Sequence, residues 1–332
     1  MKKIFTLLSV IVAQLVSGQE DYTFTTSGEN YMKAYEHLSQ EEYTAAFDYF
    51  GRVHKSDTLY DVVILNKLIA EYTAKFYKKT IKSCDEVIEN HSLYKSEAYY
   101  YKIKALTDLR KYDEAQELIT KGLKEYPLYF RYNYLKALML KDQGKYEEAK
   151  KMLQDILKVR PQHSSSHYSL AQIHAEEGAE TQAIFGFQMA IIVNRSSPVL
   201  NASFEGMADV MQGNYEISRE QEDVKPYKTL NNLIVSGLAL KNEYKADMPI
   251  RYTSNVVTDL MFNQFSYKED NSDFTMDYYG RFFNEVKKKG LEKGYILYFL
   301  GLVQDPYVQK LVSTHKRKIE AFEKFQEKYW QD

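Results

Sequence analysis

The 332-residue sequence predicts an all-α fold, an α-solenoid of repeated helix hairpins followed by a further helical region. Three observations predict this class. The chain has only 14 glycines and 6 prolines, roughly half the usual share, and a fold of many short strands needs both residues in its turns. Aromatic residues make up 14% of the chain, which excludes bulk disorder. Small and aromatic residues also recur at a fixed spacing through the first half of the chain.

Residues 1–18 are predicted to be a signal peptide. Lys2 and Lys3 precede an apolar run over 4–16, and Val16, Ser17 and Gly18 supply small residues before a cut after Gly18. The alternative is a membrane anchor, but the run of about 13 residues is shorter than the roughly 18–20 that span a bilayer. No cysteine follows the run to carry a lipid anchor. We therefore expect an exported chain, periplasmic or extracellular, with no transmembrane segment after cleavage.

A period of 34 residues is carried by alanine, tyrosine and proline. Three sets of residues share it: Ala115, Ala149 and Ala183; Tyr112 and Tyr146; Pro127 and Pro161. This pattern resembles the tetratricopeptide repeat, a pair of antiparallel helices whose apolar faces are buried by stacking on neighbouring pairs. The resemblance implies a right-handed solenoid over 27–197, with five repeats at 27–60, 61–95, 96–129, 130–163 and 164–197.

The second half, residues 198–332, is predicted to be helical but out of register with the repeats. Helices are expected at 199–211, 227–244, 256–265, 273–289, 291–303, from Pro306 onward, and at 315–330, with a polar linker at 213–226. This half resembles the C-terminal helical regions of secreted repeat proteins of Bacteroidota-like bacteria. We expect it to cap the end of the solenoid. Basic residues 316–318 are interpreted as a solvated face, the alternative being a basic docking surface.

The sequence shows no catalytic, cofactor-binding or metal-binding motif. It lacks a glycine-rich phosphate loop, a nucleophile elbow and a zinc-protease motif, so we expect no enzyme, no cofactor and no metal. His163, His167 and His174 are clustered, but the repeat register favours a buried role for the last two over metal ligation. The single cysteine, Cys84, is predicted to be buried and inert. The formal net charge of −2 gives no basic footprint for nucleic acid.

The candidate site is the concave groove of the repeats. In this family, positions 2, 5, 6, 9, 12 and 13 of each first helix line that groove, which assigns partner-binding roles to Tyr31, Tyr100, Lys104, Arg131, Tyr134, Tyr168 and Gln172. The alternative is that tyrosine is simply common at position 5. On the same register, three other tyrosines are predicted to belong to the core between helices: Tyr43, Tyr112 and Tyr146.

These observations predict a non-catalytic scaffold of the cell envelope that binds a peptide or a partner protein in the groove. The first alternative is a glycan- or small-ligand-binding protein that stacks its groove tyrosines on the ligand. The second alternative is an enzyme. The sequence identifies neither the partner nor the oligomeric state.

Overall fold

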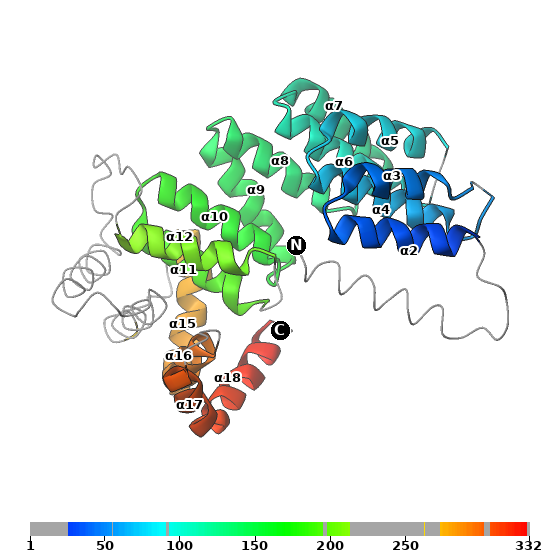
Figure 1. The fold of residues 1–332 in the computed structure, drawn as a ribbon. Helices are drawn as coiled ribbons and strands as arrows, with labels where there is room; N and C mark the ends of the chain where they lie inside the picture. Colours follow the sequence, from blue (N-terminus) through cyan, green and yellow to red (C-terminus); the bar gives the residue numbers. More distant parts are fainter. Residues whose placement is uncertain are drawn as a thin grey trace. The chain divides into compact units, whose positions relative to one another are not determined.

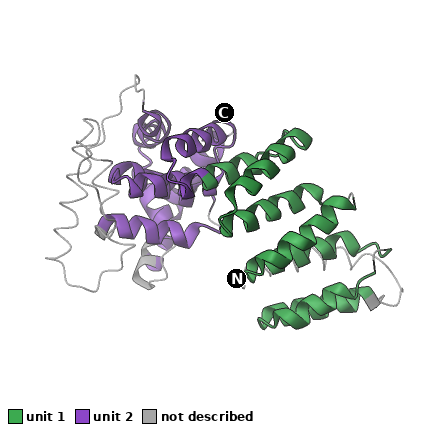
Figure 2. Cartoon of the chain, turned by 90° about the horizontal axis from the view of Figure 1, so that it is seen from above, with its two compact units in different colours: residues 1–139 green, residues 140–332 purple. Residues whose placement is uncertain are grey.

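The computed structural model describes residues 26–54, 56–90, 93–194, 198–212, 262, 273–301 and 306–330. Every regular element within these ranges is a helix, which confirms the predicted all-α class. The chain divides into two compact units, residues 1–139 and 140–332 (Figure 2). The predicted signal peptide and the predicted linker lie outside the described residues, as do the helix predicted at 227–244 and all but one residue of that at 256–265.

Unit 1 is built of helix hairpins that follow one another along the chain (Figure 1). Its helices are α2 (Thr26–Ser39), α3 (Tyr43–Gly51), α4 (Tyr60–Thr73), α5 (Tyr77–Glu89), α6 (Lys95–Asp108), α7 (Tyr112–Glu125) and α8 (Arg131–Asp142), the last of which continues into unit 2. In the α2–α3 and α6–α7 hairpins, buried alanines let the two helices approach closely. Ala34 and Ala46 of α2 and α3 have no exposed surface, and neither do Ala98 and Ala115 of α6 and α7.

The same turn closes every hairpin of the repeats. Its central residue has left-handed backbone, with φ of 62° at Glu41, 63° at Lys75, 59° at Arg110, 72° at Gly144 and 74° at Gly178. A left-handed residue ends a helix because the amides that follow it turn back to the last carbonyls of that helix. At Lys75 the amides of residues 75 and 76 donate to the carbonyls of Tyr72 and Glu71. Three of the five positions use a side chain where glycine would be unstrained.

Cys84 lies in the core of unit 1, between α4, α5 and α6. Its side chain has no exposed surface and packs with Ile64, Leu68 and Ala98. Burial raises the pKa of the thiol well above its ordinary value, so the reactive thiolate is disfavoured. The predicted buried position of this cysteine is confirmed.

Unit 2 joins the last repeats to the C-terminal helices. After the end of α8 it contains α9 (Tyr146–Val159), α10 (Ser164–Glu176), α11 (Glu180–Ile192), α12 (Leu200–Gln212), the π-helix η1 (Thr275–Gly280), α15 (Arg281–Lys288), α16 (Glu292–Leu300), α17 (Pro306–Thr314) and α18 (Lys316–Tyr329). The helices predicted at 199–211, 273–289 and 315–330 are confirmed to within one or two residues. Gly290, with φ of 65°, follows the end of α15 as predicted.

The helix α11 explains why the C-terminal helices belong to this unit. It is apolar on all sides, and every residue from Thr181 to Ile192 is buried, so it needs neighbours all around it. Helix α12 packs along it, and the ring of Phe283 stacks on Phe185 at 4.9 Å between centroids. The hydroxyl of Tyr295 donates to Gln188 at 2.9 Å. The C-terminal helices therefore cover the second helix of the last repeat.

Gly294 lies at a close crossing of α16 and α18. A Cβ atom at this position of α16 would lie 2.4 Å from the backbone oxygen of Lys318 in α18. We expect Gly294→Ala to lower the free energy of unfolding by about 1–3 kcal/mol, because the overlap outweighs the roughly 1 kcal/mol that alanine gains in a helix. Urea denaturation measures this difference. Gly51→Ala in α3 is the control, since nothing lies within 4 Å of its Cβ, and an equal loss there would contradict the overlap at Gly294.

Candidate functional site

Two cations lie on tyrosine rings in unit 1, where α4, α6 and α8 come together. We call this cluster the tyrosine–cation face, and it consists of Tyr72 from α4, Tyr100, Tyr101 and Lys104 from α6, Tyr129 from the turn before α8, and Arg131 from α8. Three of the residues predicted for the groove, Tyr100, Lys104 and Arg131, are brought together here.

Lys104 extends over the rings of neighbouring tyrosines. Its Nζ lies 4.2 Å from the ring centroid of Tyr72, 5.4 Å from that of Tyr100 and 5.9 Å from that of Tyr101. Distances below about 6 Å give a favourable cation–π attraction. Among the described residues Lys104 forms no ion pair. Asp108, one turn further along α6, accepts a hydrogen bond from the Tyr72 hydroxyl at 2.6 Å.

Arg131 occupies the other side of the same aromatic cluster. Its Cζ lies 3.7 Å from the ring centroid of Tyr100, so the guanidinium covers that ring, and it donates to the Tyr129 hydroxyl at 2.9 Å. No carboxylate within the described part of the chain forms an ion pair with it. Both cations of the face are thus oriented by aromatic rings, and neither forms an ion pair with a described residue.

Three tyrosines of the face, Tyr72, Tyr101 and Tyr129, stay neutral at physiological pH. Burial raises the pKa of Tyr101 to about 12 and that of Tyr129 to about 12, with the charge of Arg131 acting in the opposite direction in both cases. Burial also raises the pKa of Tyr72, and its hydrogen bond to Asp108 adds to the effect. The face therefore combines two cations, Lys104 and Arg131, with a cluster of tyrosine rings.

Tyr31 does not reach this face and is not an exposed groove residue. It is 5% exposed, packs edge-on against Tyr35 at 4.9 Å, and its hydroxyl accepts a hydrogen bond from Asn66 at 2.9 Å. The reason is that position 5 of one repeat contacts the first helix of the next, in this case α4. Tyr100, at 8% exposed, is covered by Arg131 of α8 in the same way. Both rings are thus largely covered by the next repeat, and their partner-binding role stays a prediction.

The tyrosines predicted for the core between helices are less buried than Tyr31 and Tyr100, two of those predicted for the groove. Tyr43, Tyr112 and Tyr146 are all half-buried, and the first two lie at the margin of their clusters. They begin the second helix of each hairpin, where the turn leaves one side of the ring open.

The remaining predicted groove residues lie on α8 and α10. Tyr134 is half-buried on α8 in unit 1. In unit 2, the amide of Gln172 donates to the Tyr168 hydroxyl at 2.9 Å, and Lys141 donates to Gln172 at 3.1 Å. The Tyr168 ring also packs against Phe187 at 5.7 Å. Nothing in the structure tests whether these side chains bind a partner, so their role stays a prediction.

Sequence reasoning missed three residues of the face. Tyr101 and Tyr72 occupy positions 6 and 12 of their repeats, which belong to the set of groove positions, so the register contained the signal that would have found them. Tyr129 lies in the turn between two repeats, outside that set, and no repeat position predicts it. Arg131 holds it in place through a side-chain hydrogen bond.

Two of the three clustered histidines, His167 and His174, are buried, as predicted. His167 has no exposed surface and His174 is 8% exposed. The Nε2–H of His167 donates to the Pro161 carbonyl at 2.7 Å, so its Nδ1 accepts from the Tyr279 hydroxyl at 3.0 Å. Within the described ranges, no three His, Cys, Asp or Glu side chains gather closely enough to hold a metal ion. No described helix is both long enough and apolar enough to cross a membrane.

Helix hairpins with buried small residues at their crossings and one repeated turn define an α-solenoid of the hairpin-repeat class. Residues 137–197 match the family model described as tetratricopeptide repeat. This match covers the segment 137–197 and not the rest of the chain.

Solved structures with low sequence identity resemble the chain. MamA from Desulfovibrio magneticus RS-1, from its residue 41 to the end, is 18% identical with a TM-score of 0.38, and the match covers 53% of this chain and 99% of that one. A tetratricopeptide repeat protein from Parabacteroides merdae ATCC 43184 is 13% identical with a TM-score of 0.41, covering 87% of this chain and 98% of that one. No curated protein matches the chain.

Proposed function

We propose that the chain is an exported, non-catalytic scaffold whose tyrosine–cation face binds a peptide segment of a partner protein. The pair of cations supports this proposal, because Lys104 and Arg131 are held on tyrosine rings while no described carboxylate forms an ion pair with either. Tyrosine and arginine are enriched where proteins bind one another. The cations suit the carboxylates and carbonyls of a peptide, and the aromatic rings suit its apolar side chains.

The ring positions give the sugar-binding alternative less support. A sugar stacks on an open aromatic face. Arg131 covers the face of Tyr100, Lys104 lies over Tyr72, and Tyr31 is buried. The face therefore offers cations and ring edges more readily than open ring faces.

A paired set of charge variants tests the binding proposal. The double variant Lys104→Gln/Arg131→Gln removes both cations of the face, and Lys82→Gln/Lys124→Gln removes two exposed lysines from α5 and α7 as a matched control. Each protein, comprising residues 19–332, is immobilised and exposed to envelope extract. Bound proteins are then quantified by mass spectrometry. We expect one or more proteins bound by the wild type and control to be reduced roughly tenfold with the face variant.

Equal recovery of all proteins by the face variant would contradict the role of the face. If the wild-type chain binds specific sugars on a glycan array and recovers no protein from the extract, the result would favour the sugar-binding alternative. The export part of the proposal rests on the N-terminal sequence and has its own test. We expect mass spectrometry of the chain recovered from the periplasm or medium to find Gln19 as the first residue, and an intact Met1 would overturn it.

A further inference from the structure

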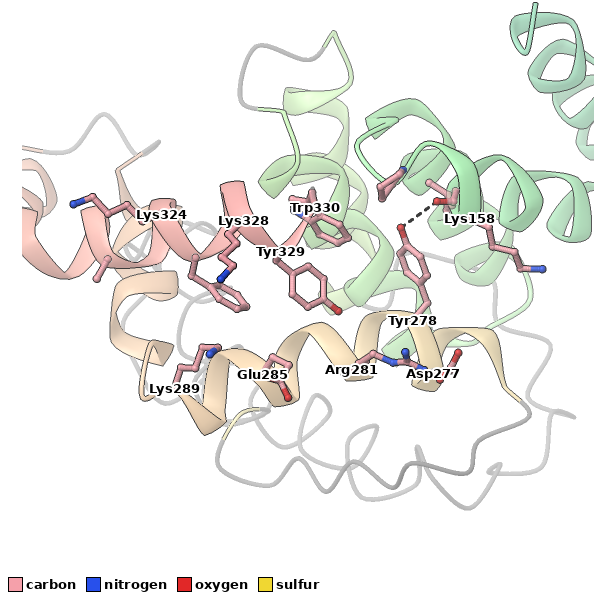
Figure 3. Close-up of a pocket in the computed structure, with 14 residues that line it drawn as sticks. Lys158, Asp277, Tyr278, Arg281, Glu285, Lys289, Lys324, Lys328, Tyr329 and Trp330 are labelled. Carbon is pink, nitrogen blue, oxygen red and sulfur yellow. Dashed lines mark hydrogen bonds and ion pairs between the residues drawn. The ribbon is translucent and has the colours of Figure 1, made fainter. Parts of the chain in front are cut away.

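A trough in unit 2 lies between two helices of the C-terminal region (Figure 3). It encloses about 1060 Å³, at the upper end of the volumes typical of ligand pockets. One wall is a stripe formed by Asp277 on η1, Arg281 and Glu285 on α15, and Lys289 directly after α15. The other wall is the facing side of α18. The end of α9 closes the trough near Lys158.

The length of the trough suits an extended chain. The stripe from Asp277 to Lys289 covers twelve residue steps, which at about 1.5 Å each give a wall of about 18 Å. An extended peptide advances about 3.3 Å per residue, so about five residues fit along this wall. A compact small molecule would leave most of the trough empty.

The floor of the trough is aromatic. The rings of Tyr278 and Trp330 are stacked at 6.3 Å, Tyr329 meets Trp330 edge-on at 4.8 Å, and Phe325 packs against Tyr329 at 5.5 Å. All four side chains are only half-buried, so they keep surface for a ligand. The Tyr278 hydroxyl donates to the Leu157 carbonyl at 3.2 Å, which joins this floor to α9.

The rim of the trough carries positive charge that the described residues leave unpaired. Arg281 is paired with Asp277 at 2.6 Å, and Glu285 is paired with Lys288 at 3.1 Å. Lys289, Lys324 and Lys328 form no ion pair within the described part of the chain. Lys289 and Lys328 extend from opposite helices toward the space between them (Figure 3).

We propose that this trough is a second binding site, which takes an extended peptide segment with alternating acidic and aromatic side chains. In an extended chain, successive side chains point to opposite sides, so aromatic residues reach the floor while carboxylates face the lysines of the rim. An anionic membrane also attracts lysines and aromatic residues. However, the planar surface of a membrane would contact the lysines of the rim without entering the trough to reach its aromatic floor. This site belongs to unit 2 and is independent of the tyrosine–cation face, so either can fail without the other.

The single tryptophan reports directly on the trough. Trp330 is the only tryptophan of the chain and lines the site, so its emission changes when the floor is covered. The probe is an acetylated and amidated six-residue peptide of alternating glutamate and phenylalanine, titrated into the full-length chain. Two further peptides replace glutamate by lysine or phenylalanine by serine. We expect the first peptide to shift the Trp330 emission with saturation, and the other two to bind at least tenfold more weakly.

A matched pair of triple variants tests the rim. Lys289→Gln/Lys324→Gln/Lys328→Gln removes the three unpaired charges, and Lys316→Gln/Arg317→Gln/Lys318→Gln removes three exposed charges from the first turn of α18, outside the trough. We expect the rim variant to weaken binding roughly tenfold and to lose most of its salt dependence, and the control to change it less than about twofold. Thermal unfolding confirms that both variants fold.

Three results would overturn the proposal. Equal weakening by the two triple variants would mean that net charge alone attracts the peptide. Equal binding of the three peptides would mean that the rim does not select acidic side chains and the floor does not select aromatic ones. A Trp330 response to vesicles of anionic lipid, without a response to the acidic peptide, would assign the trough to a membrane surface instead.

Discussion

Phe322→Ala is expected to lower the free energy of unfolding by about 3–5 kcal/mol, the largest loss from a single substitution considered for this chain. Phe322 has no exposed surface and lies at the centre of the aromatic core of unit 2. Its ring lies 5.5 Å from that of Tyr295 and 5.3 Å from that of Tyr298, so truncation leaves a cavity that these rigid rings cannot fill. Such a loss is a large part of the stability of a typical domain.

Urea denaturation followed by the emission of Trp330 measures this loss within unit 2. Val159→Ala is the control, since Val159 is 80% exposed in the same unit and its truncation should change stability by less than about 0.5 kcal/mol. Phe322 joins α16 and α18 to helices that cover α11. We therefore expect unit 2 to keep a single urea unfolding transition, shifted to lower urea concentration. A cost below about 1 kcal/mol would show that Phe322 is not the centre of a packed core.

Unit 2 is expected to lose stability as the pH falls from about 6.5 to about 4. Burial lowers the pKa of His167 to about 4, although its hydrogen bond to Pro161 acts in the opposite direction. Burial lowers the pKa of His174 to about 3, and the charge of Lys150 adds to the effect. Within this window the unfolded chain binds a proton at each histidine and the folded chain does not. The free energy of unfolding therefore falls with falling pH, by up to about 1.4 kcal/mol per pH unit for each histidine.

The double variant His167→Gln/His174→Gln isolates the contribution of the two histidines. Glutamine at 167 can still donate to the Pro161 carbonyl and accept from Tyr279, so the fold is kept at neutral pH. Glu180 of the same unit, whose pKa burial raises, acts in the opposite direction and is present in both proteins. Denaturation at several pH values gives the free energy of unfolding of the wild type and of the double variant. Plotted against pH, the two should diverge below about pH 6.5. Parallel curves would show that the histidines are not buried in their neutral form.

The repeats were predictable because their signals are local. Small residues such as Ala115, Ala149 and Ala183 recur where two helices cross, and one turn separates those helices each time. Each hairpin contacts its neighbours in sequence, so a period of 34 reports both the element and its packing partner. The same reasoning placed Cys84 in the core, where the structure has it.

The exposure of the groove tyrosines was not predictable at the same level. Position 5 predicts the direction of a side chain from its own helix, but the next repeat decides what covers it. Tyr31 is covered because Asn66 reaches it from α4, and Tyr100 because Arg131 reaches it from α8. A different residue at position 66 or 131 would leave the 34-residue period unchanged but would expose the ring of Tyr31 or Tyr100 differently.

The sequence by itself determined the class of the fold, the helix hairpins and the absence of any recognisable catalytic motif. Only the tertiary structure decided which cations face the tyrosines and how the C-terminal helices pack. His167 meets Tyr279 across 112 residues of sequence, and the trough combines α9, α15 and α18 without any common period. The physical reason is that repeat packing couples near neighbours at a constant spacing, whereas the C-terminal core depends on the shapes of particular aromatic side chains brought together from distant segments.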